Sequence, residues 1–85
     1  MDSHLILIKK KALLTFLADA IDSNGWSVNL ESQENQIYCF RENGPLIQYV
    51  DIFIRPHEFV VYYDLGKGAN MNIWSREKIA WLFAQ

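Results

Sequence analysis

The chain has 85 residues, of which 51% are hydrophobic and 14% aromatic, and its formal net charge at pH 7 is -2. This length predicts one domain covering residues 1–85, with enough apolar mass for a core that needs no disulfide or metal ion. The aromatic content excludes a disordered chain. The acidic balance argues against a domain that grips nucleic acid through its phosphates, since such domains are usually basic.

Signals for targeting are weak in this sequence. No run approaches the roughly 18 uninterrupted apolar residues of a membrane span. The order of apolar and basic residues at the amino terminus differs from that of a secretory signal peptide. The single cysteine, Cys39, cannot form an internal disulfide. We therefore expect a soluble, cytoplasmic protein with no membrane partner.

The first element is a predicted helix from about Leu5 to Asn24, because apolar side chains recur there at helical spacing. Asp2 or Ser3 can cap its start, and Gly25 stands where a left-handed residue often ends a helix. A competing interpretation makes "LILI" a short strand and begins the helix near the lysines that follow. That interpretation would place more positive charge at the positive end of the helix dipole, so the single helix is preferred.

Four strands follow, each indicated by alternation of apolar and polar residues and separated by polar, glycine or proline turns. The expected strands are "WSVNLES" (26–32), "IYCFRE" (37–42), "LIQYVDIFI" (46–54) and "FVVYYDL" (59–65). "RPHE" between the last two predicts a tight turn that sets Asp51 opposite Tyr62 and Arg55 opposite Glu58. "GKGANMN" (66–72) is expected to be a flexible loop.

A closing helix is predicted over residues 74–85, with Ser75 or Asn72 as its cap. The element order is then α-β-β-β-β-α. Short connections favour an antiparallel meander, because parallel strands need long crossovers. We therefore expect an α+β, two-layer domain in which the amino- and carboxy-terminal helices pack on one face of a four-stranded sheet.

The titratable residues give no catalytic, metal or cofactor motif. His4, His57 and Cys39 lack the spacing of a zinc site, and no nucleophile elbow is present. "GKG" does not match a phosphate-binding loop, and the lysine run 9–11 spreads around a helix instead of forming one patch. Asp51 and Asp64 share a strand face but are diagonal neighbours at best. The sequence thus predicts no enzyme, no cofactor and no small-molecule substrate.

The strongest feature is the number of aromatic residues on both faces of the predicted sheet. One face is expected to complete the core, through Val28, Leu30, Ile37, Cys39, Val50, Ile52, Ile54, Phe59, Val61 and Tyr63. The other face carries Ser27, Asn29, Val60 and the candidate partner-binding residues Tyr38, Phe40, Tyr49, Asp51, Phe53, Arg55 and Tyr62. So large an apolar set exceeds what a monomer normally shows to water. Either it binds a partner, or the last helix or a loop covers it.

These observations favour a small non-enzymatic protein-binding module, acting either as a homodimer or as the partner of a larger protein. Inhibitors, immunity proteins and antitoxins are of comparable size and charge, which is an analogy and no more. The alternative is a single-stranded nucleic-acid-binding protein whose sheet aromatics stack on bases. The net charge of -2 makes nucleic acid the weaker candidate.

Overall fold

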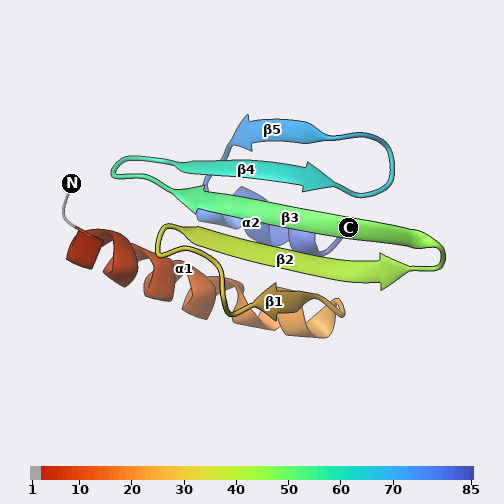
Figure 1. The fold of residues 1–85 in the computed structure, drawn as a ribbon, viewed down its shortest axis with the longest axis horizontal. Coiled ribbons are helices and arrows are strands. Elements are labelled where there is room, and N and C mark those ends of the chain that lie inside the picture. Colours follow the sequence, from red (N-terminus) through yellow and green to blue (C-terminus); the bar gives the residue numbers. More distant parts are fainter. Residues whose placement is uncertain (1–2) are drawn as a thin grey trace.

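The structure, a computed structural model, describes residues 3–85 and contains two helices and one antiparallel sheet. The elements are α1 (Ser3–Ser23), β1 (Ser27–Asn29), β2 (Gln36–Asn43), β3 (Leu46–Ile54), β4 (Phe59–Asp64), β5 (Asn70–Ile73) and α2 (Arg76–Phe83). The strands lie in the order β1-β2-β3-β4-β5, each antiparallel to the next. Both helices pack on one side of this sheet (Figure 1), so the predicted two-layer α+β meander is confirmed.

The prediction of four strands is wrong by one. The segment expected to be a flexible loop contains β5, which pairs with β4 through Val60 and Ile73 and through Tyr62 and Met71. Only four residues long and rich in asparagine, β5 gives a weak strand signal in the sequence. It is held as an edge strand by the ladder that β4 offers, which sequence periodicity does not reveal.

The core lies between the helices and the inner face of the sheet. It is built from three sets of buried side chains: Ile6, Leu13, Leu17 and Ile21 of α1; Ile37, Cys39, Val50, Ile52, Ile54 and Val61 of the sheet; and Ile79, Leu82 and Phe83 of α2, joined by Trp26. Val28, Phe59 and Tyr63 pack against this cluster and are half-buried. The inner face predicted from alternation is therefore confirmed for all but one of its members.

That exception is Leu30, whose side chain is 91% exposed. The first strand ends at Asn29, because the Asn29 side chain accepts a hydrogen bond from the Glu31 N–H at 2.9 Å and turns the chain. Val60 departs from expectation in the other direction: it points away from the helices and is nevertheless only 5% exposed. Its neighbours on adjacent strands, Phe53 and Ile73, flank it.

The helix boundaries follow the predicted signals. Ser75 Oγ accepts a hydrogen bond from the Lys78 N–H at 3.3 Å and caps α2, so the alternative cap Asn72 is wrong and lies in β5. Gly25 has a φ of 76° just after α1, as the expected left-handed residue. Within the described residues α1 spans Ser3–Ser23, so the alternative of a strand at residues 5–8 is wrong. Of the two candidate caps, Ser3 lies in the helix and Asp2 lies outside the described residues.

Candidate functional site

The sheet has a second face that points away from both helices, and we call it the open face. Register and alternation place on it Ser27, Asn29, Gln36, Tyr38, Phe40, Glu42, Ile47, Tyr49, Asp51, Phe53, Val60, Tyr62, Asp64, Met71 and Ile73. Neither helix covers this surface in the described part of the chain (Figure 1). The expected alternative, a carboxy-terminal helix lying over these residues, is therefore wrong, because α2 buries its apolar side chains in the core.

Aromatic rings on the open face form two groups. Tyr38 stacks on Tyr49 with a centroid distance of 6.3 Å and an interplanar angle of 13°, and Phe40 lies 6.2 Å from Tyr38. Across the face, Phe53 meets Tyr62 edge to face at 5.7 Å. These cross-strand contacts half-bury Tyr38, Tyr49 and Phe53, so the rings hold one another in fixed positions.

Apolar side chains on the open face remain accessible in spite of these contacts. Phe40 and Tyr62 are each 39% exposed, and Ile47, Met71 and Ile73 are between half and three-quarters exposed. Sequence reasoning missed these last three residues. The alternation of Ile47 with Tyr49 along β3 could have indicated the first, whereas Met71 and Ile73 depend on a strand too short to predict.

A shallow pocket of about 390 Å³ lies in the open face between the two groups of rings. Its lining residues are Tyr49, Asp51, Phe53, Arg55 and Tyr62. All were among the candidate partner-binding residues, and the other two candidates, Tyr38 and Phe40, adjoin the pocket through Tyr49. The structure thus gathers the predicted residues on one surface.

Asp51 occupies the middle of this surface, between Tyr38 on β2 and Tyr62 on β4. Its Oδ1 atom accepts a hydrogen bond from Gln36 Nε2 at 2.8 Å. Burial raises the pKa of the Asp51 carboxyl above its usual value, and the Gln36 hydrogen bond partly opposes this rise. The Asp51 carboxylate is therefore partly removed from water, and the neutral Gln36 amide is the hydrogen-bond donor that stabilises it.

Asp64 has a different role from Asp51. It pairs with Tyr49, two residues along β3 from the Asp51–Tyr62 pair, which confirms the predicted diagonal arrangement. Its Oδ1 atom accepts hydrogen bonds from the N–H groups of Gly66 and Gly68 at 2.7 and 3.3 Å. Asp64 therefore shapes the turn into β5, and the two carboxylates do not form a pair.

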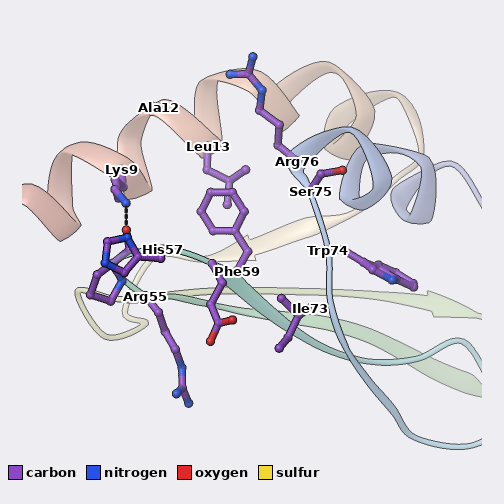
Figure 2. A pocket seen from close by; sticks show the side chains of 12 residues that line it. Lys9, Ala12, Leu13, Arg55, His57, Phe59, Ile73, Trp74, Ser75 and Arg76 are labelled. Carbon is purple, nitrogen blue, oxygen red and sulfur yellow. Dashed lines mark hydrogen bonds between the residues drawn. The ribbon is translucent and has the colours of Figure 1, made fainter.

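A second and larger hollow, of about 670 Å³, lies where α1, the β3–β4 turn and the start of α2 meet (Figure 2). Lys9 donates to the carbonyl of Pro56 across it, and the Phe59 ring stands up from β4 toward Leu13 of α1 (Figure 2). The guanidinium of Arg76 points up beside α1, whereas Arg55 points away from α1 (Figure 2). Its cationic groups therefore diverge and do not form one anion site. Sequence reasoning missed this groove because its walls come from three distant segments.

The remaining titratable candidates take structural positions. His57 lies in the turn beside Pro56, and Lys10 Nζ donates to the carbonyl of Gln33 at 2.9 Å. Cys39 is fully buried, and its burial, with a smaller contribution from the charge of Asp51, raises the pKa of the thiol to about 12. A thiol in this state is a poor nucleophile.

Comparison of the chain with protein-family models, with curated proteins and with solved structures gives no match. Over residues 3–85 the structure brings together no group of three or more side chains capable of holding a metal ion. None of the helices in the described part of the chain has both the length and the apolar character needed to cross a membrane.

Proposed function

We propose that the protein is a non-enzymatic protein-binding module and that the open face is its binding surface. The observation that supports this most directly is the accessible apolar area of the face, contributed by Phe40, Ile47, Tyr62, Met71 and Ile73. Exposed apolar side chains gathered on one face of a small domain mark an interaction site more often than they serve as ordinary surface.

The composition of the open face also suits a protein partner. Tyrosine, phenylalanine, methionine and arginine are enriched in the centres of protein interfaces. The face supplies tyrosines whose rings are already fixed by cross-strand contacts, so little side-chain entropy would be lost on binding. The pocket around Asp51 offers a recess for one anchoring side chain of the partner.

A compact partner-binding domain of this kind would act by occupying a surface of a larger protein, as inhibitors, immunity proteins and antitoxins do, or by pairing with itself. No catalytic group is required for either mode. We place the activity in the cytoplasm, since the single thiol of Cys39 is buried and unpaired.

Single-stranded nucleic acid is the second candidate, because Phe40 and Tyr62 present accessible ring surface on which bases could stack. The charges on the face oppose it. Glu42, Asp51 and Asp64 lie on the open face, with Arg55 as the cation at its edge. Such a balance would repel a phosphate backbone, so protein binding is favoured.

The proposal is tested by replacing Phe53 with Asp, which places a charge in the lining of the Asp51 pocket on the open face. The matched control is Ile8→Asp, because Ile8 is 50% exposed on α1, away from that face. Each protein is checked for folding by circular dichroism, and its mass in solution and its captured partners from the source cells are compared with those of the wild type.

We expect Phe53→Asp to stay folded and to lose the captured protein or the dimer, whereas Ile8→Asp keeps it. Retention of the same partner and the same mass by a folded Phe53→Asp variant would show that the open face does not bind. Binding of single-stranded oligonucleotides that weakens with salt would favour the second candidate instead.

A further inference from the structure

Asp51 and Phe53 lie on β3, and Arg55 follows just beyond its end at Ile54, where its N–H still bonds to the Glu58 carbonyl. The three residues alternate along the chain and line one pocket on the open face. The negative charge of Asp51 and the positive charge of Arg55 are each two residues from Phe53, which is roughly 7 Å at 3.3 Å per residue. Consider a second copy packed face to face on the first and related to it by a two-fold axis. If this axis passes over Phe53, parallel to the sheet and perpendicular to the strands, β3 of the second copy runs in the opposite direction. That operation sets Asp51 of one copy opposite Arg55 of the other, and the reverse, so the face is complementary to itself.

Neither charge has an ionic partner of its own. Within residues 3–85 the only ion pair joins Arg76 and Glu77, and the Asp51 carboxylate has its hydrogen bond from Gln36. Covering Asp51 with an apolar partner would bury a carboxylate without a cation, which costs several kcal/mol by typical values. A partner of the open face must therefore bring a cation to this pocket, and a second copy brings Arg55.

We propose that the occupant of the open face is a second copy of this chain, related by a two-fold axis at Phe53, with Arg55 of each copy entering the Asp51 pocket of the other. This inference rests on the proposed protein-binding function and names its partner. The copies meet through the row of the sheet that contains Gln36, Phe53, Val60 and Ile73, of which the last three are apolar. The two ion pairs then flank an apolar centre.

Other positions of the two-fold axis agree less well with the charges on the face. An axis through Asp51 would bring its carboxylate against that of the second copy. An axis between Asp51 and Phe53 would place the carboxylate against the ring of Phe53 and would set Arg55 opposite Tyr49, with Asp64 on the adjacent strand. The Asp64 carboxylate already accepts hydrogen bonds from Gly66 and Gly68. The axis at Phe53 is the position that gives Asp51 a cation.

The spacing and area of such an interface are consistent with a weak dimer. Sheets pack face to face about 10 Å apart, a gap that an aspartate and an arginine side chain together can span. At about 4.8 Å between strands, the four strands β2 to β5 that carry the Phe53 row are roughly 14 Å wide, and an overlap of about 25 Å that reaches the β3–β4 turn gives a footprint near 350 Å² per copy. Stable complexes bury about 800 Å² per partner, so we expect association that depends on concentration.

Charge reversal tests the inference by sedimentation equilibrium over a series of protein concentrations. Arg55→Asp places two acidic residues, and Asp51→Arg two basic residues, at the paired positions of a homodimer. We expect each single variant to stay monomeric while the wild type approaches twice the monomer mass. The double variant, and an equimolar mixture of the two single variants, should regain the dimer because complementary pairs return.

Lys11→Asp is the control, since Lys11 is an exposed cation on α1, away from the open face, and its reversal should leave the dimer unchanged. If Asp51→Arg fails to fold by circular dichroism, Asp51→Asn replaces it and should weaken the dimer. Three results would each overturn the inference. The wild type could be monomeric at every concentration, the single variants could dimerise as the wild type does, or the double variant and the mixture could fail to regain the dimer. A monomeric wild type whose captured protein is lost in Phe53→Asp would still uphold the proposed function, so the two failures are distinguishable.

Discussion

Trp26 Nε1 donates a hydrogen bond of 2.9 Å to the backbone carbonyl of Phe83, and the rings of the same two residues meet edge to face at 5.4 Å. These residues are 57 positions apart in the chain. The contact fixes the end of α2 against the segment that joins α1 to β1. The guanidinium of Arg41 lies 4.2 Å from the centre of the Trp26 ring on the same side of the molecule. One indole group therefore joins the end of α2 to the segment that precedes β1.

We predict that Trp26→Phe lowers the free energy of unfolding by about 1–3 kcal/mol, because the Phe83 carbonyl loses its buried donor. Urea unfolding followed by circular dichroism measures the change. Trp81→Phe is the matched control, since Trp81 is 50% exposed on the outer side of α2, and it should change stability by less than about 0.5 kcal/mol. Equal losses for the two variants would show that the buried hydrogen bond contributes little.

A second prediction concerns Arg41, which joins several segments at the edge of the sheet. Its Nε donates to Gln48 Oε1 at 2.6 Å, its Nη1 to the Asn24 carbonyl at 2.9 Å, and its Nη2 to the carbonyl of Gln85. Gln48 is itself only 5% exposed and donates to the carbonyl of Leu65. Lysine lacks the planar fork of donors that these acceptors require.

Arg41→Lys should therefore cost about 1–3 kcal/mol of unfolding free energy, because the buried Gln48 side chain and the part-buried Asn24 carbonyl lose a charged donor. Arg55→Lys preserves charge in the same way at an exposed position and should be neutral within about 0.5 kcal/mol. Both are measured by urea unfolding under conditions in which the protein is monomeric. A stable Arg41→Lys protein would mean that charge alone, without the fork, suffices at this site.

Neighbouring residues on β3 should differ sharply in their response to truncation, because they point to opposite faces. Ile52 is fully buried against the helices, whereas Phe53 is half-buried on the open face beside Tyr62. Ile52→Ala should cost about 2–5 kcal/mol through the cavity it leaves. Phe53→Ala should cost roughly 1 kcal/mol or less, the usual value of a cross-strand pair. A larger loss for Phe53 than for Ile52 would contradict the assignment of the two faces.

The two faces of β3 are also where sequence reasoning succeeded best. Alternation with a period of two decides which residues of a strand share a side, and β2, β3 and β4 are long enough to show it. The "RPHE" turn fixed the register, so Asp51 and Tyr62 were paired correctly, and Arg55 and Glu58 are joined by a backbone hydrogen bond of 3.0 Å. The gathering of the candidate residues on the open face follows from these local rules.

What the sequence did not reveal depends on contacts between distant segments. The strand β5 forms because β4 offers an unpaired edge, and its own residues Asn70 and Asn72 have little strand preference. Leu30 fits the alternation of β1, yet the strand ends at Asn29 through a side-chain hydrogen bond. The groove beside Pro56 needs α1, a turn and α2 at once. Periodicity within a segment carries no information on any of these.

A prediction on pH follows from Asp51, whose pKa is raised in the folded protein by burial. A carboxyl with a raised folded pKa binds its proton more tightly when folded, so it favours folding in acid and loses that contribution as pH rises through the folded pKa. Asp51→Asn keeps an acceptor for Gln36 and has no proton to lose. The variant should therefore be more stable than the wild type at neutral pH, with a difference that vanishes in acid.

Urea unfolding of the two proteins from acid to neutral pH, at concentrations where both are monomers, measures this difference. It should start to appear above the usual aspartate value of 3.8 and level off once the folded carboxyl has ionised. A difference that is constant with pH would show that Asp51 titrates alike in the folded and unfolded chain. The sign of the stability difference is also informative. If the wild type became more stable than Asp51→Asn as the pH was raised, a cation in the same molecule would be stabilising the Asp51 carboxylate.

The single thiol provides a last prediction about the core. Cys39 is fully buried beneath the helices, and burial raises its pKa to about 12, so the reactive thiolate is scarce in the folded state. Reaction with a disulfide reagent such as Ellman's reagent should therefore require the core to open. We expect the labelling rate of the native protein to fall below that of the guanidinium-unfolded protein by a factor near the equilibrium constant for unfolding.

The measurement is a stopped-flow labelling series in increasing urea, compared with unfolding by circular dichroism on the same samples. Because the chain has one cysteine, every reacted thiol reports this one site. Fast labelling in the absence of denaturant would show that the sheet separates from the helices locally, without global unfolding.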